Sequence, residues 1–265
     1  MSDAVVSVRN AKRWSGARIL KLTLVAQCAL GVFVVLADLP REFLAGLTGT
    51  ERSPEMDVPI APGNQTRRFE PRRAPLDLPA PPGFQGDDSV PSRLEFTSTD
   101  LENRDGAALL NGTIAEGDAE RFADWLLALP ALPSAIALNS PGGSVGDALT
   151  IGRLVREKAI PMVIAPGAFC FSACPYILAA GVEREVSKEG FVGVHQHYFG
   201  ENTYLPAFLL VSDIQAGQGE VMAYLEEMGI DPMIMAKALV TPPDDIYILL
   251  PEELEAFRLA TEVTE

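Results

Sequence analysis

The sequence predicts an α/β fold built on a mainly parallel β-sheet, because short apolar runs alternate with segments of helical periodicity. The apolar run 135–138 ends in a Pro-Gly-Gly turn, and the segment that follows, 147–158, carries apolar side chains at helical spacing. A second apolar run, 161–165, leads through a turn of small residues into another apolar segment, 173–180. Alternating strands and helices of these lengths are typical of parallel sheets with right-handed crossovers.

A basic stretch opens the chain, and a long apolar run follows it. The apolar run 22–37, extended by Ile19 and Leu20, approaches the roughly 20 residues that a membrane-spanning helix needs. We therefore expect a cytoplasmic basic segment at 1–18 and a signal-anchor helix at 19–38 in the inner (cytoplasmic) membrane. Such a single pass would place the rest of the chain on the periplasmic, extracytoplasmic side. A cleavable signal peptide and a buried core helix are the alternatives.

The next segment, 39–92, is rich in proline and poor in aliphatic residues from residue 51 onward. Such a composition buries too little apolar surface to offset the entropy of ordering the chain. We expect a disordered, semi-rigid linker. Its arginines would be solvated or would contact a phospholipid or a partner; they are Arg67, Arg68, Arg72 and Arg73.

The globular domain is expected to span 93–265. Its first part predicts two strands, 94–100 and 107–114, and a helix over 118–129 that ends at Pro130. The remaining elements expected are a strand at 191–197, a loop at 199–210, helices at 213–228, 232–239 and 251–257, and a final strand at 258–263.

Several residues suited to acyl transfer occupy turns that follow predicted strands. Gly142 and Gly143 leave backbone amides unshielded, and such amides can hold an oxyanion. Ser172 lies where a strand turns into a helix, with the Ala173 amide facing the same way, and His195 lies in the last predicted strand of this region. A nucleophile, a base and oxyanion amides are the parts of an acyl-transfer site. The alternatives are a helix-capping serine, a core histidine and simple turn glycines.

Three motifs carry a family resemblance: NSPGGSVGDAL, CFSACPYILAAG and FVGVHQH. They resemble the proteolytic subunit of the Clp protease and, more widely, the Clp/crotonase fold of repeated β-β-α units, which includes signal peptide peptidase A. The resemblance covers 94–265. It implies Ser172 as nucleophile, His195 as base, the amides of Gly142, Gly143 and Ala173 as oxyanion donors, and assembly into a homo-oligomer.

A triad also needs a third member beside the serine and the histidine. A carboxylate is needed on the far ring nitrogen of the histidine to hold its tautomer. Asp244 and Asp245 are the acids in the segment that resembles the aspartate-containing stretch of the family, yet the family pattern puts Thr241 at that position. We expect Asp245 to serve, and the alternatives are Asp244, a Ser-His pair helped by Thr241, or an inactive site.

The cysteines and the second histidine leave alternatives open. Cys170 and Cys174 bracket Ser172, and the alternatives for them are a disulfide, buried thiols or a catalytic cysteine. His195 and His197 are two residues apart, so both would face one side of a strand. No pattern of cysteines or acids completes a metal site around them, so we expect no metal and no cofactor, and His197 to line the cleft.

The charge and the motifs together define the expected function. The net charge of −15 argues against a nucleic-acid partner, whose phosphates would repel the chain. What the resemblance implies is a membrane-tethered, exported serine hydrolase, a peptidase that acts on a peptide or protein substrate. The competing hypotheses are an inactive Clp-like scaffold that binds a peptide or partner, and an acyl-thioester hydrolase.

Overall fold

The computed structural model describes residues 16–37, 53, 60–71, 90–101, 104–197 and 207–265. They fall into two compact units, one ending at Arg52 and the other running from Ser53 to Glu265. The basic segment before Gly16, Arg72 and Arg73, most of the predicted linker and most of the predicted loop at 199–210 lie outside the described residues.

The first unit contains helix α1, Gly16–Ala37. Within it, Gly16–Val34 is long and apolar enough to cross a membrane, and none of that stretch is buried. The helix predicted from the apolar run is therefore present, and it is not a core helix. A membrane anchor and a signal peptide both agree with this observation.

The second unit is organised around a six-stranded sheet with the strand order β10-β7-β5-β4-β3-β2. Each neighbouring pair is parallel except β2 and β3, which form an antiparallel pair. The mainly parallel sheet of the prediction is thus confirmed. The strands are β2 (Glu95–Leu101), β3 (Arg104–Asn111), β4 (Ile136–Asn139), β5 (Met162–Ile164), β7 (Arg184–Ser187) and β10 (Glu262–Thr264).

A second sheet of four strands has the order β1-β9-β8-β6. Its strands are β1 (Thr66–Arg68), β6 (Phe169–Phe171), β8 (Phe191–Val194) and β9 (Asp245–Ile248). Successive strands β5 and β6, and then β7 and β8, go to different sheets, which gives the repeated β-β-α units. The turn predicted between β5 and the next helix is instead strand β6. Strands of three or four residues are too short to show a reliable alternation in sequence.

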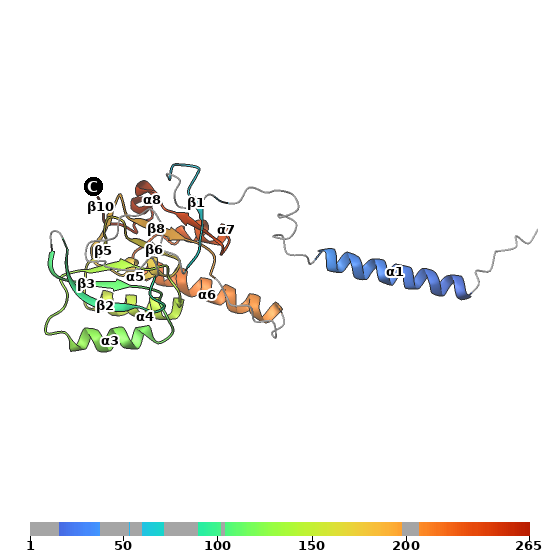
Figure 1. Cartoon of the computed structure of the whole chain (residues 1–265), viewed down its shortest axis with the longest axis horizontal. Coiled ribbons are helices and arrows are strands. Elements are labelled where there is room, and N and C mark those ends of the chain that lie inside the picture. Colours follow the sequence, from blue (N-terminus) through green and yellow to red (C-terminus); the bar gives the residue numbers. More distant parts are fainter. Residues whose placement is uncertain (1–15, 38–52, 54–59, 72–89, 102–103, 198–206) are drawn as a thin grey trace, which may run out of the picture. The chain divides into compact units, whose positions relative to one another are not determined.

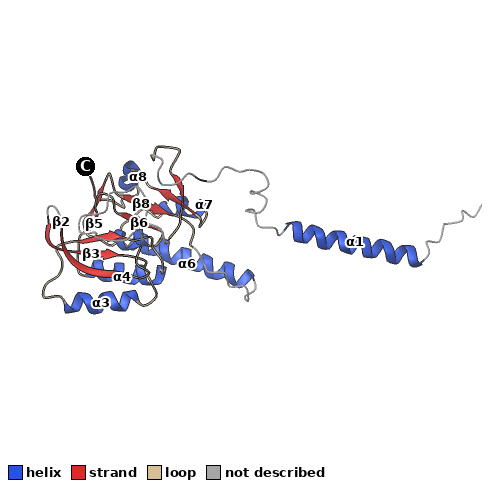
Figure 2. Cartoon of the chain, in the orientation of Figure 1, coloured by secondary structure: helices blue, strands red, loops and turns tan. Residues whose placement is uncertain are grey.

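The helices agree with their predicted positions to within a few residues, except that α6 begins six residues earlier. They are α3 (Asp118–Ala128), α4 (Val145–Glu157), α5 (Cys174–Ala179), α6 (Ala207–Glu227), α7 (Ile234–Val240) and α8 (Pro251–Ala256). Figure 1 shows α3 and α4 beneath β2 and β3, and the colouring of Figure 2 separates this helical layer from the strands. Ser144 caps α4 by accepting a hydrogen bond from the Asp147 amide.

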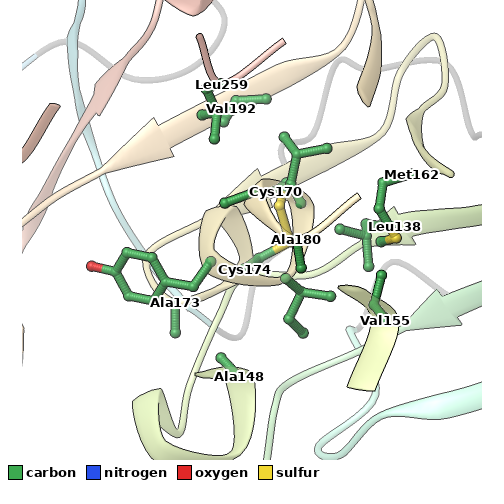
Figure 3. Close-up of a cluster of buried hydrophobic side chains, with 14 of the residues drawn as sticks. Leu138, Ala148, Val155, Met162, Cys170, Ala173, Cys174, Ala180, Val192 and Leu259 are labelled. Carbon is green, nitrogen blue, oxygen red and sulfur yellow. A yellow bond between two sulfur atoms is a disulfide. The ribbon is translucent and has the colours of Figure 1, made fainter. Parts of the chain in front are cut away.

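The main core surrounds the short helix α5, whose six residues are all buried. Figure 3 shows the side chains that pack there, from strands, from α4 and from near the C-terminus. Gly152 lets α4 and α6 approach closely, because a Cβ at that position would lie 1.9 Å from the Tyr224 hydroxyl oxygen. That hydroxyl donates to the Tyr176 carbonyl across 2.7 Å, so α6 is tied directly to α5.

Residues 60–71, which we call the strap, are folded onto this unit, so the prediction of a disordered linker is wrong there. β1 pairs with β9 in antiparallel register, and Gln65 and Arg67 are buried. Arg67 donates to the Asn64 carbonyl, whereas Arg68 is exposed. Backbone pairing and polar contacts order the strap, and neither gives the apolar pattern by which a strand is recognised in sequence.

Candidate active site

Ser172 lies at a sharp corner between β6 and α5. Its φ of 61° falls in the left-handed region that non-glycine residues rarely adopt, and its amide donates to the Gly193 carbonyl across 3.0 Å. Its Oγ lies 2.7 Å from Nε2 of His195. The serine therefore does not cap α5, whose N-cap residue is Ala173.

His195 reaches the serine because the two residues follow neighbouring parallel strands. β6 and β8 are in register with Phe171 opposite Gly193, so both chains leave the sheet at the same end. The strand predicted for 191–197 ends at Val194, and His195 lies just beyond it. His195 as a whole residue is 5% exposed.

The partner of the far ring nitrogen fixes the tautomer of His195. Nδ1 lies 3.0 Å from the carbonyl oxygen of Pro243, which can only accept a hydrogen bond. Nδ1 therefore carries the proton, and in the neutral ring Nε2 is left as an acceptor for the Ser172 hydroxyl. This is the arrangement that a general base requires.

The expected carboxylate at this position is not found, which corrects the assignment of Asp245. Its Oδ2 accepts a hydrogen bond from Ser53 at 2.9 Å, and Asp244 is exposed at the rim of the cleft. The Thr241 hydroxyl donates to the Lys237 carbonyl of α7. A backbone carbonyl, which any residue type supplies, occupies the place where a carboxylate was expected.

The glycine turn follows β4 and packs against the serine corner. At Gly142, with φ of 90°, a Cβ would lie 2.6 Å from the Ser172 Cβ, so only glycine fits there. The Gly142 amide donates to Oγ of Ser140 across 3.1 Å, which removes it from the expected oxyanion set. The amides of Gly143 and Ala173 donate to no described residue, which leaves both of them available to an oxyanion.

A disulfide joins Cys170 and Cys174 across the corner that holds Ser172, with a Cα–Cα distance of 5.1 Å. Figure 3 shows it within the apolar core, and both cysteines are fully buried. Of the three alternatives predicted for these two cysteines, the structure contains the disulfide. The bond links the middle of β6 to the first turn of α5 and so closes a short loop that contains Ser172.

The serine, the histidine and the glycine turn line one cleft of about 690 Å³. His197 lines it too, as expected from its spacing, and its Nε2 lies 2.8 Å from the Tyr176 hydroxyl oxygen. The walls are largely apolar, with the carboxylates of Glu116 and Asp244 at the lining. The strap, which the sequence did not associate with the site, contributes Phe69 and Pro71.

Burial determines the protonation state of His195. It lowers the pKa of His195 to about 4, since a charged ring is poorly solvated there, and the hydrogen bond to the Pro243 carbonyl only partly opposes this effect. Burial also lowers the pKa of His197. At neutral pH the ring of His195 is therefore neutral, and its unprotonated Nε2 is able to accept a proton from Ser172.

No family model matches the chain, and no curated protein matches it either. Among solved structures, it is similar to a mutant of ClpP1 from Listeria monocytogenes, with 21% identity and a TM-score of 0.47 over 59% of this chain and 90% of that one. It is also similar to a mutant of a membrane-bound stomatin-specific protease, with 19% identity and a TM-score of 0.41 over 57% and 75% of the two chains. At these identities the likeness concerns the fold alone.

The low pKa of His195 predicts reactivity in acid. A reagent that modifies an activated serine should react with Ser172 at a nearly constant rate from pH 7 down to pH 5, with half the rate near pH 4. The rate should persist into acid because His195 can accept a proton only while its ring is neutral, and its pKa lies below the ordinary value. Rates of modification measured by mass spectrometry across this range check it, and a midpoint near 6.5 would contradict it.

Replacing Asp245 by Asn tests the corrected assignment. Because its carboxylate contacts Ser53 and not His195, we expect Asp245→Asn to change the rate of Ser172 modification less than about tenfold. Loss of a true orienting carboxylate lowers the rate by about 10⁴-fold. His195→Ala is the positive control for a large loss, and an equal loss in both variants would restore Asp245 to the triad.

Removing the disulfide should destabilise the domain. For so small a loop, the chain-entropy model gives about 2 kcal/mol of unfolding free energy, to which the loss of buried sulfur adds. We expect Cys170→Ala combined with Cys174→Ala to lower the urea midpoint of the full chain. Cys28→Ala, an exposed position on α1, is the matched control and should leave the midpoint unchanged.

Proposed function

We propose that this chain is a Clp-like serine hydrolase, tethered to a membrane and exported, that cleaves peptide bonds through an acyl-enzyme on Ser172. The observation that carries the proposal is the 2.7 Å contact between Ser172 Oγ and the acceptor nitrogen of His195. The amides of Gly143, which lines the same cleft, and of Ala173, the residue after Ser172, would complete the set of groups that acyl transfer needs.

The first half of the reaction forms the ester. Ser172 Oγ attacks the peptide carbonyl carbon while Nε2 of His195 takes its proton, and the oxyanion accepts hydrogen bonds from the two amides. The Pro243 carbonyl accepts from Nδ1–H throughout and stabilises the imidazolium. The C–N bond then breaks, and His195 returns the proton to the departing amine.

The second half releases the acid product. A water molecule replaces the amine, gives a proton to His195 and attacks the ester carbon, after which Ser172 recovers its hydrogen as the C–O bond breaks. Because a neutral carbonyl stabilises imidazolium less than a carboxylate does, we expect slower turnover than in a complete Ser-His-Asp triad.

Export is supported by two features of the chain. A buried disulfide is typical of proteins that fold in an oxidising compartment. The basic residues before α1 favour retention of that end in the cytoplasm, so the domain after α1 would lie on the other side. Self-association, expected from the resemblance, stays a prediction that light scattering of the full chain tests.

A fluorophosphonate probe tests the proposal directly. We expect the full chain to be labelled at Ser172 and to hydrolyse unstructured peptides, and Ser172→Ala to lose both. Ser144→Ala, which removes another hydroxyl from the same cleft, is the matched control and should still be labelled.

Two other results would contradict the proposal. An unlabelled wild-type chain that still binds peptides would favour the inactive scaffold. A labelled chain that hydrolyses acyl thioesters and no peptides would favour the thioesterase alternative.

A further inference from the structure

The strap contacts the proposed base through Phe69. The ring centroids of Phe69 and His195 are 4.9 Å apart with the planes at 75°, an edge-to-face contact, and Phe69 also lies 6.1 Å from the Phe171 ring. Phe69 is half-buried and lines the cleft. One side of the imidazole that faces Ser172 is therefore covered by a residue from a segment far upstream in the chain.

The backbone of the strap also holds the loop that orients His195. The Phe69 amide donates to the Asp244 carbonyl across 2.9 Å, one residue after the Pro243 carbonyl that binds Nδ1. Arg68 lies opposite Asp245 in the antiparallel pairing of β1 with β9. The strap thus fixes the loop and the ring that the loop orients.

Side chains fasten the strap at its other end. Gln65 Nε2 donates to the Tyr247 hydroxyl across 2.7 Å and to Glu253 Oε2 across 2.6 Å. Lys237 Nζ donates to the same hydroxyl at 2.9 Å and pairs with Glu253 at 3.0 Å. Because β9, α7 and α8 all contribute to this network, the strap is anchored to three elements of the domain.

We propose that the strap is a positioning element of the active site, in which Phe69 holds the His195 ring in line with Ser172 and keeps water from that side of the ring. The catalytic consequence rests on the proposed function, whereas the effect on His195 does not. The contacts with Ser172 and with the Pro243 carbonyl fix the ring at its nitrogens, and the phenyl contact restricts its remaining rotation.

Loss of the phenyl ring should admit water and weaken the burial that keeps His195 uncharged. The other charged or titratable groups that line the cleft are His197, Asp244 and Glu116. The strap also carries Arg68 and Glu70, an exposed pair 3.8 Å apart that is not among the lining residues. Replacing Phe69 changes none of these side chains and keeps the backbone amide that binds Asp244, so we expect a change in the titration of His195 to report on the loss of the phenyl ring.

The test compares Phe69→Ala and Phe69→Leu with Phe191→Leu in the full chain. Phe191 packs against the same small cluster of Phe169, Phe171, Ile246 and Ile248, and it makes no ring contact with His195 among the described residues. Leucine keeps part of the apolar volume but not the planar ring that covers His195, so it preserves folding if alanine does not. Phe69→Tyr, which keeps the ring, is the rescue variant.

Histidine-selective NMR gives a readout that needs no activity. The chain has only two histidines, and His197→Asn assigns their signals. We expect Phe69→Ala and Phe69→Leu to raise the titration midpoint of His195 by about one pH unit or more, toward its ordinary value. Both substitutions should also remove the ring-current shift of the His195 Cε1 proton. Phe191→Leu and Phe69→Tyr should titrate like the wild type.

The kinetic readout separates positioning from binding. We expect kcat of Phe69→Leu to fall about tenfold, with KM changed less than about threefold, because a displaced base slows proton transfer more than it weakens binding. An unchanged titration in both Phe69 variants, or an equal shift in Phe191→Leu, would overturn the inference. A wild-type chain that is neither labelled nor active, but whose His195 midpoint still moves in Phe69→Leu, would instead refute the proposed function alone.

Discussion

The parallel pairing of β6 with β8 is the constraint on which the site depends. It sets Phe171 opposite Gly193, so the two chains leave the sheet side by side, one bearing Ser172 and the other His195. Gly193 must lack a side chain, since a Cβ there would lie 2.6 Å from Ile246 of the next strand. A two-residue slip of this register would separate the hydroxyl from the imidazole by about 7 Å along the strands.

Features of the fold and site that depend on local residue patterns could be predicted from the sequence. The helices α3 and α4 follow from apolar periodicity and stop signals, and the glycine turn and Ser172 follow from small residues placed after apolar runs. The orienting group of His195 could not be found in this way, because the Pro243 carbonyl belongs to the backbone and every residue has one. Only coordinates reveal which carbonyl faces a given ring nitrogen.

The strap escaped prediction for a related reason. Proline and charged residues dominate its neighbourhood, and composition averaged over 39–92 points to disorder, although three residues within it complete a sheet. Its order comes from long-range partners such as Tyr247 and Glu253, some 180 residues further along the chain. A short stretch of sequence does not reveal such distant partners, so the expected site did not include Phe69, which lines the cleft.

The pairing of β1 with β9 also protects an edge of the four-stranded sheet from pairing with another molecule. Within the described residues, β9 pairs with β8 on one side and with the three-residue strand β1 on the other. A recombinant version trimmed to begin at residue 93 would leave that flank of β9 with unsatisfied peptide groups, a template on which a second molecule can add a strand. Such a shortened protein should therefore tend to precipitate, and boundaries for heterologous production are better drawn ahead of residue 60.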